Sequence, residues 1–348
     1  MQTITQELAL SLVKQYWQIT GSIKELPSYA DRNFKLTTSQ GKFVFKIANP
    51  NWSYADLDIE NEALLHLATT CPDLSLPKVM LTPEHKHIIP FTTTSGELCH
   101  LRLLSFVEGD MYANVVKRDD IDQTYLQTSL GIAIGKLDHG LSDFTHASMD
   151  RYVDWNISNL TELQDEIENI DDLALRELVT KHTHYFAANE AHWKATLPMS
   201  VIHNDANDFN VIVDSDANDP RPHVNAVIDF GDMCRHLRIV DLAITMVYAV
   251  QSIKNEDAVR DCLLAIVRGY QTQNPLNTHE IKVLFHIIMA RLCQSILMAT
   301  RAYRKNPEND YILVSQQGVR RLIRQLEAMD YLQLQAQFLH IISAQNHT

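Results

Sequence analysis

Glycine is scarce in this sequence, with 10 among 348 residues, and the glycines form none of the patterns that cradle phosphates. There is no G-x-G-x-x-G. The nearest approach to a phosphate-binding loop, at Gly135 and Lys136, has Leu130 where the first glycine belongs and Leu137 after the lysine. The five cysteines are scattered without a C-x-x-C pair. The scattered cysteines predict reduced thiols in a cytoplasmic protein. The missing glycine motifs argue against a Rossmann dinucleotide-binding fold and against a phosphate-binding-loop fold.

Positive charge is also in short supply, because 30 basic residues face 43 acidic ones and the net charge is −13. Nucleic acids and anionic membranes carry the same sign, so we expect neither as a partner. No apolar run reaches about 18 residues, and the best candidate, 239–250, contains Asp241, so no transmembrane helix is expected. The N-terminal residues lack the basic and apolar regions of a signal peptide.

One acidic segment imitates a metal site. Asp214, Asp216 and Asn218 have the spacing that opens a calcium-binding loop, but Asp219 stands where that loop requires glycine. We interpret the segment as a polar turn.

Length and periodicity predict two parts, since domains average about 150 residues. The expected elements of the first part are a helix at 3–17, strands within 21–48, a helix at 56–69, a hairpin between Pro77 and Pro90, and a strand at 101–107. From about residue 120 the chain reads as helical, apart from a strand-rich patch between 200 and 230. The predicted boundary follows residue 106.

Two polar loops in this patch carry the chemistry. Apolar runs flank residues 203–210, where Asp205 and Asn210 are five apart, and a second apolar run delivers Asp229 nineteen residues after Asn210. Magnesium prefers hard oxygen ligands and phosphates. Asn210 and Asp229 would supply such oxygens, while Asp205 would accept a proton from a substrate hydroxyl. This division of labour is that of kinase-type phosphoryl transfer.

The two loops resemble the catalytic and metal loops of the aminoglycoside phosphotransferase-like kinases, whose usual H-G-D-x-x-x-x-N has glycine in place of Asn204. The details are most similar to the hydroxylysine kinase group, and also to kinase domains fused to class III aminotransferase-like proteins. The resemblance implies an α/β (α+β) protein-kinase-like bilobal fold. Residues 1–106 would form a small antiparallel-sheet N-lobe that binds nucleotide, and residues 107–348 a mostly helical C-lobe, with the nucleotide between them.

Further site residues follow from this resemblance. Lys46 matches the strand lysine that binds nucleotide phosphates, and Glu60 matches the glutamate that pairs with it, with Glu62 as the competing candidate. The segment 28–34, with Ser28 and Asn33, lies at the place of the nucleotide-covering loop, although it has no glycine.

The hinge beside the nucleotide base would be residues 103–107, including Leu103 and Phe106. Asp241 resembles a structural aspartate that accepts backbone N–H groups of the catalytic loop. His203 would orient that loop rather than act as the base.

The resemblance implies ATP or GTP as co-substrate, Mg²⁺ as cofactor, and 5-hydroxylysine or another small amino alcohol as acceptor. Homoserine, choline, ethanolamine and aminoglycosides are the acceptors of neighbouring families. Asp208, Asp232 and Glu108 are candidates for an acidic wall facing an amine and are equally candidates for solvated surface charges. Trp155 is a candidate for the acceptor side or for the core.

Two other functional classes compete with a small-molecule kinase. A nucleotide-binding pseudokinase is disfavoured because Lys46, Asp205, Asn210 and Asp229 are all intact. A protein kinase is disfavoured because no A-P-E-like segment follows Asp229 before the predicted helix at 239–250.

Overall fold

The computed structural model of the chain describes residues 4–28, 31–214, 220–308 and 310–345. Tyr29 and Ala30, within the predicted nucleotide-covering loop, lie outside the described residues. The same holds for 215–219, which form most of the segment that resembles a calcium loop.

The chain divides into two compact units. The first comprises Met1–Glu108 and Thr145–Arg151, and the second comprises Gly109–Phe144 and Tyr152–Thr348. The sequence does not predict that 145–151 return to the first unit. His146 holds this segment by an ion-pair contact to Asp58, at 3.3 Å between Nε2 and Oδ2.

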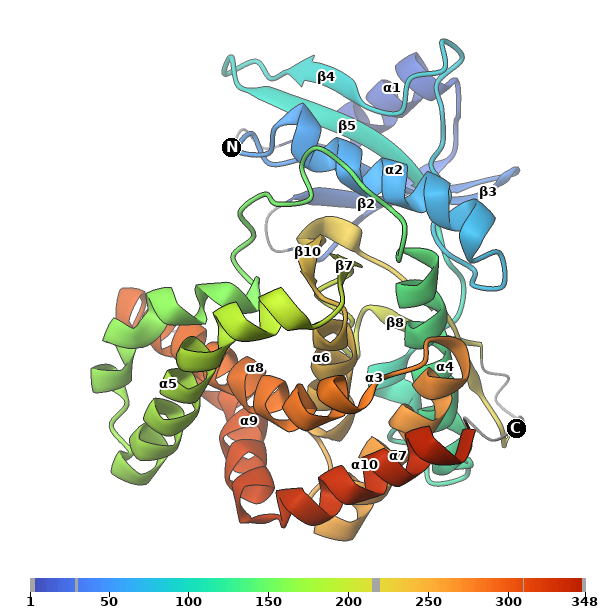
Figure 1. Cartoon of the computed structure of the whole chain (residues 1–348). Helices are drawn as coiled ribbons and strands as arrows, with labels where there is room; N and C mark the ends of the chain where they lie inside the picture. The colour runs from blue at the N-terminus through green and yellow to red at the C-terminus, as the bar shows by residue number, and fades with distance from the viewer. Residues whose placement is uncertain (1–3, 29–30, 215–219, 309, 346–348) are drawn as a thin grey trace. The chain divides into compact units, whose positions relative to one another are not determined.

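An antiparallel sheet of five strands forms the centre of the first unit (Figure 1). In order across the sheet the strands are β1 (Ser22–Leu26), β2 (Arg32–Thr38), β3 (Gly41–Ile47), β5 (Leu98–Ser105) and β4 (Ile89–Thr92). Alternate residues of a strand face the same side, so Phe43, Phe45 and Ile47 of β3 all lie in the apolar core. Helix α1 (Gln6–Trp17) contributes Leu12 and Trp17 to this core.

The opposite face of the sheet is polar. Lys46 of β3 lies directly across from Arg102 of β5 and from Asn33 of β2, so the three residues form a row on one face. Helix α2 (Tyr54–Thr70) is the element that contacts this row, through Glu60. The helix begins at a capping box in which Ser53 and Asp56 bind each other's backbone N–H groups.

The hairpin predicted between Pro77 and Pro90 is wrong. In this stretch the described chain makes one bridge, from Val79 to Leu104, and a turn closed by the Thr82 N–H donating to the Lys86 carbonyl. The hairpin forms instead between β4 and β5. Pro90 is tolerated inside β4 because β4 is an edge strand, where a missing N–H breaks no ladder.

The second unit is largely helical, as predicted (Figure 1). Its helices are α3 (Tyr112–Val115), α4 (Gln123–Gly140), the 3₁₀ helix η1 (Ile157–Asn169), α5 (Leu173–Thr196), α6 (Ile239–Val250), α7 (Glu256–Gln273), α8 (Thr278–Lys305), α9 (Asp310–Ala328) and α10 (Tyr331–Gln345), with the short 3₁₀ turn η2 (Phe230–Asp232). Helix α8 packs against α5, α6, α9, α10 and η1 and is the central helix of this unit.

Helices α4 and α7 approach each other very closely because glycines lie at their contact. A Cβ atom on Gly131 of α4 would lie 2.0 Å from the Ile266 carbonyl oxygen. A Cβ on Gly269 of α7 would lie 2.0 Å from the carbonyl oxygen of Thr128. No side chain fits at either position without moving one of the two helices.

Two small antiparallel sheets place the polar loops. Strand β7 (Met199–Ile202) pairs with β10 (Cys234–Leu237), while β8 (Val211–Asp214) pairs with β9 (His223–Val227) and with β6 (Asp110–Met111). The loop 203–210 runs from β7 to β8, and the loop 228–233 runs from β9 to β10. Because both pairs are antiparallel, the two loops pass between the same two sheets and lie side by side.

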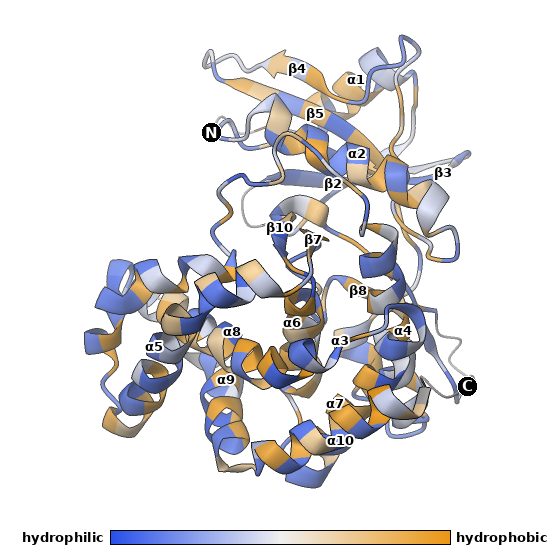
Figure 2. Ribbon diagram, in the orientation of Figure 1, coloured by the Kyte–Doolittle hydropathy of each residue, from blue (hydrophilic) through white to orange (hydrophobic). Residues whose placement is uncertain are grey.

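Among the described residues, α8 is the one helix long and apolar enough to cross a membrane, and its most apolar window is 72% buried inside the fold. The most apolar run found in the sequence, 239–250, is the shorter helix α6. Figure 2 shows the hydrophobic residues of α8 among the surrounding helices, which is the pattern of a core helix.

Candidate active site

Asp241 anchors the loop that carries Asp205. Its two carboxylate oxygens accept the backbone N–H groups of His203 and Asn204, both at 2.6 Å. Asp241 lies in the first turn of α6 and is fully buried. The role predicted for Asp241 agrees with this geometry.

A second buried carboxyl group supports Asp241. Burial, together with the negative charge of Asp241, raises the pKa of Asp138 in α4 well above its usual range. Tyr270 of α7 donates its hydroxyl hydrogen to Asp138 Oδ2 at 2.7 Å. Burial raises the pKa of Asp241 as well, but the N–H groups of His203 and Asn204 favour the charged form of Asp241.

Asn204 occupies the position where the related loops have glycine. Its φ of 66° lies in the left-handed region, which asparagine tolerates better than other side chains do. The substitution also adds a contact, because Asn204 Nδ2 donates to the Asp232 carbonyl at 3.1 Å. Asn204 thus ties the two polar loops together.

His203 orients the loop, as expected. Its Nδ1 accepts from the Asp205 N–H at 3.3 Å and its Nε2 faces the Ile228 carbonyl at 3.1 Å. A nitrogen that accepts carries no proton, so these contacts require the neutral tautomer with its hydrogen on Nε2. The ring packs edge-on against Phe230 at 4.7 Å between centroids.

Asp205 is held by two amide groups. Asn207 Nδ2 and Asn210 Nδ2 donate to Asp205 Oδ2 at 3.0 and 2.9 Å. Burial raises the pKa of Asp205 to about 7; the charge of Arg291 opposes this rise, whereas the carboxylates of Asp232 and Asp229 add to it. Its side chain keeps 21% of its surface exposed. A carboxylate so placed can bind a hydroxyl group and accept its proton.

Asn210 and Asp229 lie at neighbouring ends of β8 and β9. The Ile228 N–H donates to the Asn210 carbonyl at 2.8 Å, so Asp229 follows immediately after the residue opposite Asn210. The Asn210 amide nitrogen is engaged by Asp205, which leaves its Oδ1 as the oxygen for a cation. An amide oxygen and a carboxylate are hard ligands that fit Mg²⁺.

In the first unit, Lys46 and Asn33, two of the predicted nucleotide-binding residues, lie on the polar face of the sheet. Lys46 is buried there with 8% of its surface exposed. Glu60 binds Arg102 Nη1 at 2.7 Å, a buried partner that the sequence analysis did not find. The pairing of Glu60 with Lys46 stays a prediction. Glu62 faces elsewhere, since its carboxylate groups with Asp58 and His87 within 4.8 Å.

The remaining nucleotide candidates are distributed around this sheet. Asn33 Nδ2 donates to Ser28 Oγ at 3.1 Å, which ties the described part of the covering loop to β2. Leu103 is fully buried in the core beside α1, so it could contact a nucleotide only through its backbone. Phe106 lies under Lys35, whose Nζ is 3.7 Å from the ring centroid.

The three candidates for an acidic wall differ in their surroundings. Glu108 is exposed and paired with Lys42 at 2.6 Å, which is the arrangement of a surface ion pair. Burial raises the pKa of Asp208. Asp232 lies close enough to Asp205 to act on its charge. Of the three candidates, Asp232 therefore shares the surroundings of Asp205.

Arg291 of α8 is the site residue that the sequence analysis missed. Its Nη2 lies 3.8 Å from Asp205 Oδ1, and its guanidinium stacks on Trp155 at 4.7 Å from the ring centroid. The available signal is that Arg291 and Gln294 interrupt an otherwise apolar stretch of α8.

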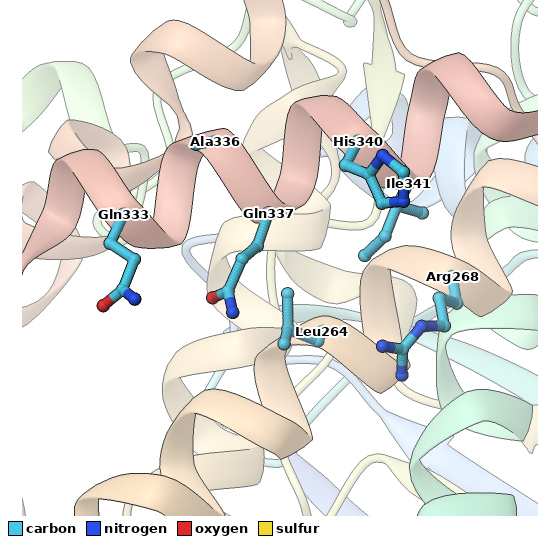
Figure 3. A pocket seen from close by; sticks show the side chains of 7 residues that line it. All are labelled: Leu264, Arg268, Gln333, Ala336, Gln337, His340 and Ile341. Atoms are coloured by element: carbon cyan, nitrogen blue, oxygen red, sulfur yellow. The ribbon is translucent and has the colours of Figure 1, made fainter.

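A separate pocket of about 390 Å³ opens between α7 and α10 (Figure 3). Leu264, Ala336 and Ile341 provide its apolar wall, with Arg268 and His340 at its edge. None of the predicted site residues lines it, so it contributes nothing to the chemistry around Asp205.

Residues 22–279 match the model of the phosphotransferase enzyme family. The chain belongs to this family. It is a small-molecule kinase, a phosphotransferase with an alcohol group as acceptor. A hydroxylysine kinase from Danio rerio is 26% identical to this phosphotransferase over 324 residues, which cover 90% of this chain and 89% of the relative.

Two solved kinase structures share the fold of this phosphotransferase. Amicoumacin kinase, solved with AMP-PNP, Ca²⁺ and Ami, has a TM-score of 0.73 at 14% identity, covering 95% of this chain and 97% of that one. A microcompartment-associated aminopropanol kinase has a TM-score of 0.71 at 14% identity, covering 93% and 98%. The predicted kinase-like fold, with an antiparallel-sheet N-terminal part and a helical C-terminal part, is confirmed.

Proposed function

We propose that this phosphotransferase transfers the γ-phosphate of ATP or GTP to the hydroxyl of a small amino alcohol, with 5-hydroxylysine as the leading acceptor. The observation that carries the proposal is the geometry of Asp205. The amide groups of Asn207 and Asn210 both bind Oδ2, so Oδ1 is the oxygen that remains for an acceptor hydroxyl. Similarity to a hydroxylysine kinase over 90% of the chain supports the acceptor class.

Asp205 would bind the acceptor hydroxyl, orient its oxygen toward the phosphate and take its proton as the new bond forms. A loose phosphoryl-transfer transition state demands positioning more than covalent work. The N–H groups of Asn207 and Asn210 keep the carboxylate in one orientation. Asp241 keeps the loop backbone in place.

Asn210 Oδ1 and Asp229 are the groups that would hold Mg²⁺. When bound with a nucleotide, the ion would neutralise charge on the phosphate oxygens. Lys46 is the proposed phosphate-binding cation of the first unit, with Ser28, Asn33 and Phe106 as further nucleotide contacts. The acids Asp208 and Asp232 would favour an acceptor that carries an amine.

A turnover assay tests the proposal. Release of ADP or GDP is measured with 5-hydroxylysine, homoserine, ethanolamine, choline and an aminoglycoside, each with ATP and with GTP. We expect turnover of 5-hydroxylysine that requires Mg²⁺ and is lost in Asp205→Asn. Asp261→Asn is the matched control, because it makes the same chemical change at a side chain that is 70% exposed on α7.

Nucleotide binding without turnover of any acceptor would instead support a pseudokinase. If another acceptor is turned over and 5-hydroxylysine is not, the protein is a small-molecule kinase whose acceptor differs from the one proposed.

A further inference from the structure

Arg291 is anchored at one end of its guanidinium group. It lies in α8 with 1% of its side chain exposed. Its Nη1 donates to the Trp155 carbonyl at 3.0 Å and to Gln294 Oε1 at 2.9 Å. The Trp155 ring stacks on the guanidinium plane. These contacts fix both the position and the plane of the cation.

The other edge of the same group has no hydrogen bond. Nε and Nη2 are buried and make none with any described residue. These two nitrogens direct parallel N–H bonds to one side, the geometry that grips a carboxylate in a bidentate manner. Leaving two donors of a buried cation unsatisfied is unfavourable, so an acceptor group that bonds to both of them would be stabilising.

The open edge of Arg291 lies beside Asp205, on the side of Oδ1. Nη2 is 3.8 Å from that oxygen, too far for a hydrogen bond. Asp205 is prevented from closing the gap because Asn207 and Asn210 hold Oδ2. Asn210 is also the proposed metal ligand, so the two oxygens of Asp205 face different neighbours. Asn210, which would hold the metal, lies toward Oδ2, and Arg291 lies toward Oδ1, where the acceptor hydroxyl would bind.

We propose that the Nε and Nη2 edge of Arg291 binds a carboxylate of the acceptor, so that the substrate is a hydroxy amino acid rather than a plain amino alcohol. The inference rests on the proposed function and narrows it. Charge supports the assignment. Asp229 and Asp232 act on Asp205 with negative charge that also repels a carboxylate, and Arg291 is the cation that meets Asp205 within the described residues. A bound carboxylate would satisfy Nε and Nη2, which make no hydrogen bond with the described residues. The Tyr248 hydroxyl lies beside the same guanidinium group.

Matched pairs of acceptors test the inference. The pairs are 5-hydroxylysine and its decarboxylated analogue, and homoserine and its decarboxylated analogue, so that the members of a pair differ only in the carboxylate. Wild type should prefer the carboxylated member in kcat/KM by roughly 10–100-fold, the loss expected from one charged hydrogen-bonded contact. In Arg291→Gln the preference should fall to near one, through a higher KM for the carboxylated member.

Two variants keep the experiment interpretable. Arg291→Lys retains the positive charge but not the paired N–H donors of the guanidinium group. It should keep the fold and lose most of the preference for the carboxylated acceptor. Arg301→Met is the control, since it removes an arginine from the same helix ten residues, or about 15 Å, further along. Each preference is a ratio within one variant, so partial loss of folded protein does not change it.

Three results would overturn the inference. Wild type could show no preference within either pair. Arg291→Gln could slow both members equally through kcat, which would mean that Arg291 acts by positioning Asp205. It could also raise KM for the nucleotide with every acceptor, which would mean that the edge binds phosphate.

Failure of the proposed function looks different. In that case wild type turns over no member of either pair. The inference is then tested separately, by calorimetric titration of 5-hydroxylysine and of its decarboxylated analogue in the presence of AMP-PNP. Equal affinity for the two would refute it.

Discussion

Asp205 combines a catalytic role with an unfavourable environment for its charge. Burial raises the pKa of Asp205 to about 7. The charges of Asp232 and Asp229 add to this rise, and the charge of Arg291 opposes it. A base with a pKa near neutrality can both accept a proton and release it. The raised pKa also means that the fold favours the protonated form. The ionised form therefore destabilises the protein above pH 7, and this effect is absent below the unfolded-state value of about 4.

The first prediction is that Asp205→Asn loses about 10²–10⁴-fold in turnover, since a positioned base contributes that much. Asparagine keeps the size of the side chain and an oxygen for the two amide donors but cannot take a proton. Because the ionised aspartate is unfavourable in this site, the variant should melt at an equal or higher temperature than wild type above pH 7. Turnover, nucleotide affinity and melting temperature are measured on the same variant.

A structural role would give the opposite stability result. If Asp205 only holds its loop, the variant melts earlier and binds nucleotide more weakly. Near-normal turnover with any accepted substrate would reject Asp205 as the base.

The second prediction concerns Asp229. Mg²⁺ keeps much of its water and relies on phosphate oxygens, so it should bind strongly only together with a nucleoside triphosphate. Asp229→Asn should remove most of this nucleotide-dependent binding in a calorimetric titration, and Asp261→Asn should leave it intact. An unchanged isotherm for Asp229→Asn would remove Asp229 from the metal site.

Among the elements, the α4–α7 pair links packing to the catalytic loop. The glycines at the contact let α4 approach α7, and Gly135 of α4 lies against the Tyr270 backbone, with 2.8 Å from a Cβ position to the carbonyl oxygen. That approach permits the bond from Tyr270 to Asp138, which supports Asp241. The position of the loop thus depends on a helix contact that contains no catalytic residue.

The third prediction is that Gly131→Ala destabilises the protein by about 1–3 kcal/mol, the usual penalty for forcing atoms into a packed contact. Turnover of the folded fraction should fall as well, because the shift of α4 disturbs Asp138. Gly318→Ala is the control. It lies in α9, where the added Cβ would meet the flexible Gln251 side chain at 3.2 Å, and a helical alanine is favoured over glycine. Chemical denaturation gives both values, and equal stability of the two variants would contradict the prediction.

The molecule as a whole has an excess of acidic residues, so its stability at low pH depends on the carboxylates whose pKa is lowered by hydrogen bonds and ion pairs. Burial alone would raise the pKa of Glu190 in α5, but contacts from His236, Lys194 and Ser158 outweigh burial and lower it to about 2. Lys194 Nζ lies 2.7 Å from the carboxylate. These contacts join α5, β10 and η1, so Glu190 helps to hold three elements of the second unit together.

The fourth prediction follows from this depressed pKa. The stabilisation by ionised Glu190 is fully present above the unfolded-state value of 4.5 and is lost as the pH falls toward about 2. Glu190→Gln should therefore reduce the free energy of unfolding by about 1–3 kcal/mol at pH 7, with a smaller deficit at pH 3. Glu177→Gln, at an exposed position of the same helix, is the control. A deficit that is equal at both pH values would contradict the assignment.

The sequence by itself was enough for features written in consecutive residues. Alternation at Phe43, Phe45 and Ile47 predicts strand β3, because a strand buries every second side chain. The five-residue spacing of Asp205 and Asn210 between two apolar runs predicts a loop that turns both side chains to one point, and the structure joins them at 2.9 Å. The family also follows from these local motifs.

Only the tertiary structure decided which distant residues complete those features. Glu60 meets Arg102 because β5 pairs with β3, a register that the residues around Glu60 do not encode. Arg291 reaches Asp205 because α8 passes through the centre of its unit, 86 positions further along the chain. Such contacts depend on how whole elements pack, and packing is a sum over many weak interactions that no short segment specifies.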